Sequence, residues 1–282
     1  MAPIVVLLIL AGLGLAHALV VGAILVSIVL PNPLAQLQDK GPPEMWGLNP
    51  ERTIVGDGSP AWYFSHPEQE CAVLVCHGRS RSKKWMLPLI AEISKRFPVL
   101  AIDFPSHGEQ RYGTTSVGLK EADTVGFAID WLVRRGHTRV MVYGVSMGGA
   151  ASIISIGRDE PKAVIGLVTD GAFDELPNVI RNISSKLPLP RYLQRAAFAI
   201  AGRIVGSEPK DVRPILFAPN LKVPCLFLHG ERDRLVPREC AAALAMVTDR
   251  GELELYDGSH DEPCNPEMQR RVMAFLDKTA TS

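Results

Sequence analysis

The stretch VYGVSMGGA, residues 142–150, places one serine among three glycines directly after an apolar, strand-like run. Ordinary turn residues would explain a single glycine, but they do not explain the spacing Gly144-x-Ser146-x-Gly148. A serine between the end of a buried strand and the start of a helix takes a strained backbone conformation. Glycines two residues to either side remove the Cβ atoms that would collide there. The stretch therefore predicts a sharp strand-to-helix turn that lifts the Ser146 hydroxyl clear of a sheet.

The chain from residue 51 onward alternates strand-like and helix-like segments. A short hairpin is expected around Asp57, followed by six apolar strands: CAVLVCHG, PVLAIDF, RVMVYGV, AVIGLVTD, VPCLFLHG and GELELYDG. Helices are expected over residues 83–96, 119–135, 150–158, 239–247 and 266–278. Buried strands separated by helices predict an α/β fold with a mostly parallel, doubly wound sheet that is covered on both faces.

One interval, residues 171–218, is too long to be a simple crossover between two strands. It contains two apolar stripes at helical spacing, which predict a small helical cap inserted into the domain. Between Glu175 and Gly206 the sequence has five basic residues against one acidic residue. Two interpretations of this charge are equally open, a solvated polar face and a contact with an anionic surface or substrate.

A serine hydroxyl becomes a good nucleophile only when a base takes its proton, and that base must itself be oriented. Of the seven histidines, His260 follows the last strand, in a loop that can reach over the edge of the sheet. Asp233 follows the penultimate strand, and Asp170 follows the strand before that one. We favour Asp233 as the orienting acid, because its loop adjoins that of His260 if the strands follow in sheet order. A surface turn is the alternative role for His260, and a helix cap is the alternative for Asp233.

The N-terminal region carries an uncharged apolar run of 27 residues, at positions 4–30. At about 1.5 Å per residue it is long enough to cross a bilayer, which predicts a single-pass transmembrane anchor. A cleaved signal peptide is the alternative, but the run exceeds the roughly 7–15 apolar residues of such a peptide and no basic residue precedes it. Lys40 and Arg52 follow it and slightly favour a cytoplasmic catalytic domain. Residues 31–50 contain five prolines and are expected to form an extended linker to the catalytic domain, residues 51–282.

The composition excludes several classes of partner. The 30 basic and 30 acidic residues cancel, so overall charge gives no reason to expect binding to nucleic acid. The five cysteines lack the spacing of a metal site and show no disulfide framework. We expect no metal and no organic cofactor, and the expected partners are a small-molecule or lipid-like substrate and the membrane.

Five motifs resemble those of the α/β-hydrolase superfamily: VCHGRS, IDFPSHG, GVSMGG, LHGERDRLVP and GSHDEP. They present Ser, Asp and His in the order that the superfamily uses. The resemblance implies the α/β-hydrolase fold, with Ser146 as nucleophile, His260 as general base and then acid, and Asp233 as its orienting acid. It further implies an oxyanion hole formed by the backbone N–H groups of Met147 and Arg79. Within the superfamily the chain is most similar to membrane-anchored, short-cap hydrolases of the Bem46-like and prolyl-oligopeptidase-like groups.

This resemblance implies a serine hydrolase that cleaves carboxylic esters or thioesters through an acyl-enzyme. The anchor and the cap helices add the narrower expectation of a lipid-like or acylated substrate. The alternatives are a serine peptidase or amidase of the same fold and a non-catalytic binding protein that keeps the fold. Met147 stands where many prolyl peptidases have tyrosine, which favours the esterase. The run RSRSKK, residues 79–84, has four cations beside the predicted oxyanion hole and is either a solvated loop or a site for phosphate or carboxylate.

Overall fold

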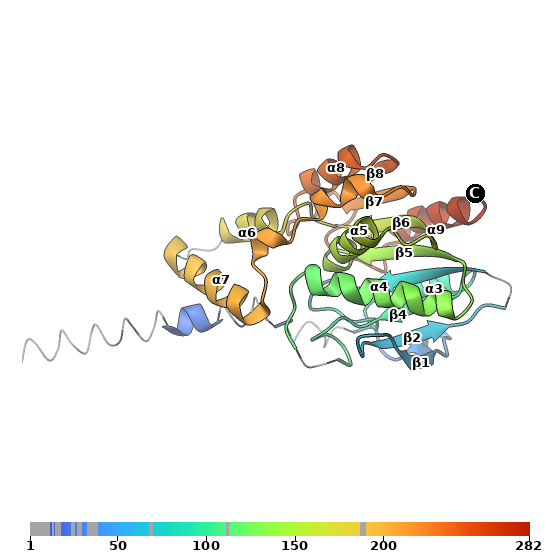
Figure 1. Cartoon of the computed structure of the whole chain (residues 1–282), viewed down its shortest axis with the longest axis horizontal. Coiled ribbons are helices and arrows are strands. Elements are labelled where there is room, and N and C mark those ends of the chain that lie inside the picture. Colours follow the sequence, from blue (N-terminus) through green and yellow to red (C-terminus); the bar gives the residue numbers. More distant parts are fainter. Residues whose placement is uncertain are drawn as a thin grey trace, which may run out of the picture.

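The computed structural model describes residues 12, 14, 18–23, 26, 30–32, 39–67, 70–110, 113–186 and 190–282. These residues contain an eight-stranded sheet in the order β1-β2-β4-β3-β5-β6-β7-β8 (Figure 1). Strands pair in parallel from β4 to β8, whereas β2 runs antiparallel to both of its neighbours, β1 and β4. The predicted mostly parallel sheet and the hairpin before it are both confirmed.

The strands follow the apolar runs of the sequence closely. Their bounds are β1 Glu51–Ile54, β2 Pro60–Phe64, β3 Cys71–Cys76, β4 Val99–Ile102, β5 Arg139–Val145, β6 Val164–Asp170, β7 Cys225–Gly230 and β8 Gly251–Tyr256. The α-helices are α3 Leu87–Ile93, α4 Leu119–Arg134, α5 Met147–Asp159, α6 Leu176–Ser184, α7 Arg191–Val205, α8 Arg238–Val247 and α9 Pro266–Ala280. Short 3₁₀ turns are η1 Pro43–Trp46, η2 Pro209–Asp211, η3 Pro214–Leu216 and η4 Ala218–Asn220.

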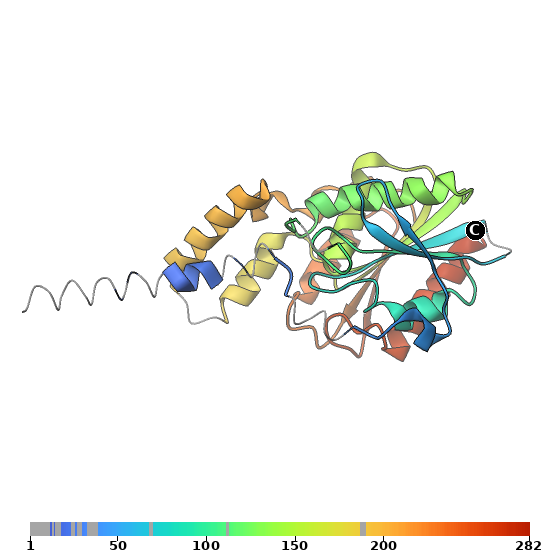
Figure 2. The same cartoon turned by 90° about the horizontal axis from the view of Figure 1, so that it is seen from below.

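Both faces of the sheet carry a hydrophobic core, because successive side chains of a strand point to opposite faces. On β3, Ala72 and Leu74 belong to a core with α4, α5 and α8. The alternate residues Val73 and Val75 belong to a second core with α3 and α9. Figure 2 shows α4 on one side of the sheet and α3 and α9 on the other. The predicted doubly wound arrangement agrees with β3 being apolar and buried at every position.

Two helices begin three or more residues away from the position that the sequence suggested. The helix expected from residue 83 begins at Leu87, because turns precede it in which the Lys83 N–H donates to Asp103 Oδ1 at 2.8 Å. The helix expected from residue 150 begins at Met147, because the turn at Ser146 passes directly into it. Both differences come from long-range or steric constraints that helical periodicity does not express.

A buried ion pair anchors the loop between β3 and α3, residues 77–86. The side chains of Lys83 and Asp103 are 0% and 1% exposed, and the ammonium of Lys83 contacts both Asp103 Oδ2 and, at 3.2 Å, Glu109 Oε2. The Glu109 N–H also donates to Asp103 at 2.8 Å. Lys83 therefore has a structural role, as the buried cation that fixes its own loop. The two roles expected from the sequence, a solvated loop or a site for phosphate or carboxylate, do not describe this residue.

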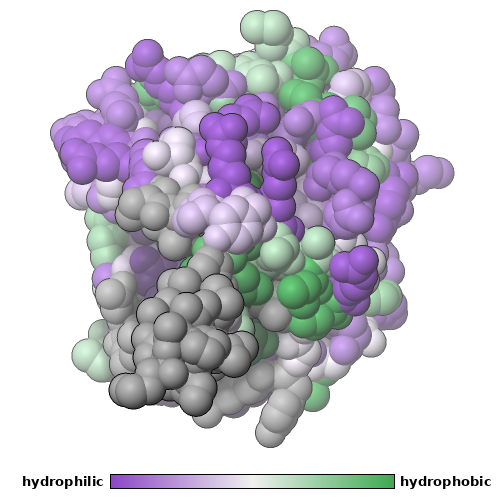
Figure 3. Space-filling view, turned by 90° about the vertical axis from the view of Figure 1, so that its left-hand side faces the viewer, coloured by the Kyte–Doolittle hydropathy of each residue, from purple (hydrophilic) through white to green (hydrophobic). Residues whose placement is uncertain are grey.

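The cap helices α6 and α7 follow β6, at the carboxyl ends of the parallel strands. In Figures 1 and 2 they project from one end of the molecule, away from the C-terminal helix α9. Figure 3 shows this end of the surface, where hydrophobic and hydrophilic residues stand side by side. The cap is thus placed over the edge of the sheet at which β5, β7 and β8 end.

The described residues of the N-terminal region lie at this same end. The Arg79 guanidinium donates to the carbonyl of Leu30 at 3.1 Å, and the Asn32 N–H donates to Ser80 Oγ at 2.8 Å. The start of the predicted linker therefore lies against loop 77–86, although the sequence led us to expect an extended spacer.

None of the helices among the described residues is both long and apolar enough to cross a membrane. Most of the predicted anchor, residues 4–30, lies outside the described residues.

Candidate active site

Ser146 occupies the strained turn that the glycine pattern predicts. Its φ of 49° and ψ of −112° lie in a region that L-residues rarely adopt. The Ser146 N–H donates to the carbonyl of Asp170 at 2.8 Å, and the Ser146 carbonyl accepts from the Ala150 N–H at 2.9 Å. Conformations of this kind cost about 1–3 kcal/mol and persist only where the surrounding structure holds them. Here the ends of β5 and β6 and the first turn of α5 hold it.

The glycines around Ser146 are required by close backbone contacts. A Cβ atom on Gly144 would lie 2.6 Å from the carbonyl oxygen of Gly148, and one on Gly148 would lie 2.4 Å from that of Cys76. A Cβ on Gly149 would lie 2.9 Å from the carbonyl oxygen of Gly144. The steric explanation of the glycine spacing is confirmed, and turn formation alone would not require it.

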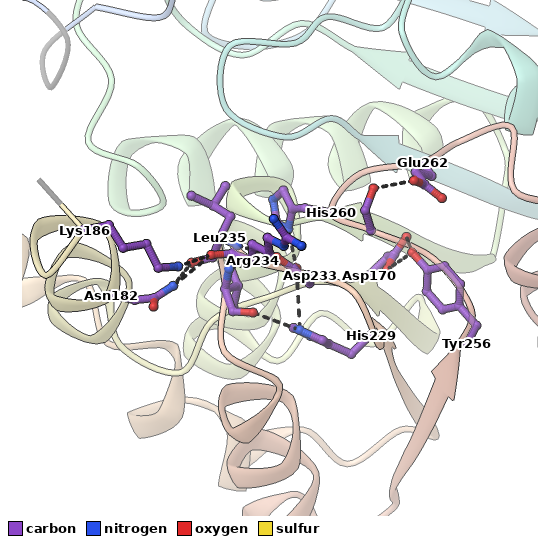
Figure 4. A network of polar contacts seen from close by, with 12 residues as sticks. Asp170, Asn182, Lys186, His229, Asp233, Arg234, Leu235, Tyr256, His260 and Glu262 are labelled. Carbon is purple, nitrogen blue, oxygen red and sulfur yellow. Dashed lines mark hydrogen bonds and ion pairs between the residues drawn. The ribbon is translucent and has the colours of Figure 1, made fainter.

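The structure brings Asp233 and His260 together at the carboxyl ends of the neighbouring strands β7 and β8 (Figure 4). His260 Nδ1 lies 2.6 Å from Asp233 Oδ2. The other carboxylate oxygen of Asp233 accepts from the N–H groups of Leu235 at 2.7 Å and Val236 at 3.0 Å. A carboxylate only accepts, so the imidazole donates through Nδ1, and its Nε2 is left to accept a proton.

The contact between Asp233 and His260 shifts both pKa values towards the charged forms, the carboxylate and the imidazolium. Burial lowers the pKa of His260, but the hydrogen bond and charge of Asp233 outweigh it, and the net pKa is raised above 6.5. Burial raises the pKa of Asp233, but the His260 contact and the two backbone N–H groups bring it below its ordinary 3.8. The carboxylate is charged at neutral pH, and it stabilises an imidazolium next to it.

Other contacts fix the loop that carries Asp233. The imidazole of His229 donates through Nε2 to the carbonyl of Val236 at 3.1 Å and lies 3.5 Å from Asp233 Oδ2. From α6, Asn182 donates to the carbonyl of Leu235 at 2.8 Å. Figure 4 shows these groups converging on the loop. The cap is therefore attached directly to the loop that carries Asp233.

Asp170, the rival acid, has different partners. The Tyr256 hydroxyl donates to its carboxyl oxygens at 3.0 and 3.1 Å, and the Tyr143 hydroxyl lies 3.4 Å away. Burial raises the pKa of Asp170 from 3.8 to about 7. A carboxyl that is only partly ionised at neutral pH and is bound to two tyrosines is poorly suited to orient an imidazole, whereas Asp233 contacts the ring directly.

Asp261 forms a connection that the sequence did not reveal. Its two carboxylate oxygens accept from Arg81 Nε and from Trp85 Nε1, each at 2.9 Å. The Arg81 guanidinium also lies 3.8 Å from the centre of the Trp85 ring. Asp261 itself has a positive φ of 61°. These contacts join the loop of His260 to loop 77–86, and the only signal in the sequence is a carboxylate directly after His260.

The predicted oxyanion donors flank Ser146. Met147 is the first residue of α5, so its N–H points out of the start of a helix, where developing negative charge is favoured. Arg79 follows Gly78, and a Cβ on Gly78 would lie 3.6 Å from Cβ of Ser146. Both backbone segments therefore lie next to Ser146, as the predicted oxyanion hole requires.

A cavity of about 720 Å³ opens above these groups, and both Ser146 and His260 line it. Its walls are mainly apolar. They come from α6, from α7, from the Asp233 loop and from the N-terminal region, and include Ile180, Ile183, Phe198, Leu235, Val26 and Leu30. The contribution of the N-terminal region was not anticipated, because nothing in the spacing of residues 4–30 relates them to the sheet. A hydroxyl, an imidazole and an apolar chamber together suit attack on a carbonyl attached to a hydrocarbon group.

The described residues contain no group of three or more His, Cys, Asp or Glu side chains that could hold a metal ion. The five cysteines are free thiols, four of them buried and Cys264 exposed.

Comparison with known proteins places these features in context. A model of the alpha/beta hydrolase family matches residues 73–274. Protein bem46 of Schizosaccharomyces pombe is 23% identical over 184 residues, which cover 61% of this chain and 54%, about half, of that protein. The Pyrococcus furiosus esterase Pf2001 superposes with a TM-score of 0.71 at 23% identity, covering 90% of this chain and 98% of the esterase. A membrane phospholipase A described as a bacterial virulence factor gives a TM-score of 0.61 at 18% identity, with full coverage of both chains. At these identities the solved structures show a common fold.

The two acids are expected to respond differently to neutralisation. Asp233→Asn removes the carboxylate that fixes the imidazole, and we expect kcat for a short p-nitrophenyl ester to fall by at least about 10³-fold. Asp170→Asn keeps an oxygen that accepts from the tyrosines, and activity should stay within about tenfold of the unchanged protein. Steady-state kinetics of both variants decides between them, and a larger loss for Asp170→Asn would contradict the assignment of Asp233.

The raised pKa of Asp170 predicts how stability changes with pH. The unfolded chain loses this proton near pH 4 and the folded chain near pH 7, so folding stability falls as pH rises through that window. The interval of about three pH units corresponds to about 4 kcal/mol. Asp170→Asn removes the loss, and its melting temperature should decrease less between pH 5 and pH 8. The melting temperatures are measured by circular dichroism at each pH. An equal fall in melting temperature from pH 5 to pH 8 for both proteins would contradict the raised pKa of Asp170.

Proposed function

Because the chain belongs to the alpha/beta hydrolase family, we propose that it is a serine hydrolase that cleaves carboxylic esters or thioesters through an acyl-enzyme. One observation carries this proposal: Ser146, on its strained turn, lines the same cavity as His260, whose ring is bound to Asp233 at 2.6 Å. Nucleophile, base and orienting acid are the three parts that acyl transfer by a serine needs.

In the proposed mechanism, Ser146 Oγ attacks the carbonyl carbon of the substrate while His260 Nε2 takes its proton. Asp233 stabilises the imidazolium that forms. The N–H groups of Met147 and Arg79 donate to the oxyanion of the tetrahedral intermediate, and one such donor typically contributes about 3 kcal/mol. The imidazolium then protonates the leaving alcohol or thiol. Water, deprotonated by the same imidazole, releases the acid from Ser146.

The apolar cavity supports a lipid-like or acylated substrate. Side chains of both cap helices and of the N-terminal region form its walls, so a hydrocarbon chain attached to the reacting carbonyl would be removed from water. The names of the structural neighbours, an esterase and a membrane phospholipase A, agree with this class of substrate. We further propose that residues 4–30 are a retained single-pass anchor, with the catalytic domain on the cytoplasmic side. A peptidase or amidase and a non-catalytic binding protein are the competing functions.

Replacing the nucleophile tests the proposal. Ser146→Ala should reduce hydrolysis of short p-nitrophenyl esters by at least about 10³-fold and abolish labelling by a fluorophosphonate. Substrates with ester, thioester and amide bonds, compared on the unchanged protein, separate the esterase from the peptidase. Labelling that persists in Ser146→Ala would contradict the mechanism, and ligand binding without any labelling of the unchanged protein would favour a binding protein.

The cavity walls predict a preference for acyl length. Ile183 lines the cavity from α6, and Ile183→Trp should shorten the space available to a hydrocarbon chain. At about 0.8 kcal/mol per buried methylene group, two lost methylenes reduce kcat/KM for long-chain p-nitrophenyl esters roughly tenfold, with acetate unaffected. Val133→Trp is the matched control, because Val133 is 45% exposed on α4 and does not line the cavity. The same chain-length profile for both variants would exclude this wall from the acyl site.

A further inference from the structure

The exposed face of α7 has a regular pattern of two rows. Tyr192, Ala196, Ile200 and Ile204 recur every four residues and form an apolar row. One position earlier, Arg191, Arg195, Ala199 and Arg203 form a second row that carries three arginines, and all eight residues are exposed. Residues four apart lie on the same face of a helix, so the two rows run beside each other along it.

The apolar row is strongly exposed, although a helix face in contact with water normally carries polar residues. The side chains of Tyr192, Ile200 and Ile204 are 59%, 39% and 52% exposed. The opposite face of the helix already packs inward, through the buried Leu193, Ala197 and Ala201 and through Phe198, which lines the cavity. The exposed apolar row is therefore not needed to pack the cap onto the protein, and it is available for a contact outside the cap.

Charge identifies the chemistry of that contact. The sequence of residues 176–206 contains five basic residues and no acidic residue. The two basic residues outside α7 bind within the protein: Lys186 donates to the carbonyl of Arg234 at 2.8 Å, and Arg181 donates to Asn178 at 3.1 Å. The three arginines of α7 are exposed beside apolar side chains, and the contact that the structure gives for them stays within the helix, from Arg203 to the carbonyl of Ala199 at 3.4 Å. A helix of this kind fits an interface between water and anionic lipid headgroups.

The position of α7 supports the same partner. Residues 18–23, within the uncharged N-terminal segment, lie at the same end of the molecule as α7 in Figures 1 and 2. Ala23 and Val26 line one cavity together with Gln194 and Phe198 of α7. Helix α7 therefore lies next to the part of the chain that is richest in uncharged apolar residues, which contacts its cavity side. A nucleic acid or an acidic protein would match the arginines but would leave the apolar row in water.

We propose that the exposed face of α7 rests on an anionic lipid bilayer, with its arginines at the headgroups and its apolar row below them. This contact places the apolar wall of the cavity next to the lipid surface. It does not depend on hydrolysis, because the docking of the helix can be measured on a protein that turns over no substrate.

The test places a fluorescent reporter at Ile200 of the full chain. Ile200→Cys is labelled with an environment-sensitive dye, in a background in which Cys264→Ser removes the exposed thiol. The protein is reconstituted into vesicles of phosphatidylcholine, with or without phosphatidylglycerol, that carry a quencher on the acyl chains. Met246→Cys is the matched control, because Met246 is 85% exposed near the end of α8, at the opposite edge of the sheet.

We expect quenching at position 200 in the anionic vesicles, little quenching there without phosphatidylglycerol, and none at position 246 in either. Replacing Arg191, Arg195 and Arg203 with glutamine should lower the ratio of docked to undocked cap by about fivefold per arginine, or roughly a hundredfold in all. The lysine variants should retain most of the docking. Hydrolysis of a short soluble ester should be unchanged in the glutamine variant, which shows that the fold is intact.

Three outcomes would overturn the proposal. A label at position 200 that remains in water in both kinds of vesicle shows that α7 touches no lipid. A dye at position 200 that leaves water only as protein concentration rises, whatever the lipid charge, identifies a second copy of the chain as the partner. Equal quenching of the glutamine and lysine variants removes the role of the arginines. A protein that docks but does not hydrolyse esters would leave this proposal standing while the proposed function fails.

Discussion

The close approach of the backbone around Ser146 is the constraint on which the rest of the site depends. A Cβ atom on Gly148 would lie 2.4 Å from the carbonyl oxygen of Cys76, so β3, β5 and the first turn of α5 pack with no room for side chains. That packing holds Ser146 at a positive φ and directs its hydroxyl away from the sheet. It also brings Gly78, and with it the predicted oxyanion loop, next to the serine. One steric fact thus positions both the proposed nucleophile and the backbone segments next to it.

The order of the strands supplies the remaining geometry. Because β7 and β8 are neighbours and run in parallel, the loops that follow them carry Asp233 and His260 to the same edge of the sheet. Side-chain contacts then fix these loops at atomic distances. Asp261 ties the His260 loop to Arg81 and Trp85, while the Lys83–Asp103 pair holds the same loop 77–86 from below. The charged residues of that loop are mostly occupied in structural roles.

The cap and the N-terminal region complete the site from outside the sheet. Helix α6 binds the Asp233 loop through Asn182, and its apolar side chains form one wall of the cavity. Leu30 and Asn32 are hydrogen-bonded to Arg79 and Ser80 of loop 77–86. The elements proposed to bind a hydrocarbon chain are therefore in contact with the elements proposed to do the chemistry. Docking of α7 on a bilayer would connect both to the lipid surface.

The sequence by itself determined the strands, the doubly wound order of the elements and the turn at Ser146, because hydrophobic periodicity and glycine sterics are local properties. It also narrowed the orienting acid to two candidates, Asp233 and Asp170, and only the tertiary structure distinguished their surroundings. The tyrosines that bind Asp170, the partners of Asp261 and the ion pair of Lys83 join residues that lie 20 to 180 positions apart. Such pairings depend on how the chain folds back on itself, and no local pattern of residues records them.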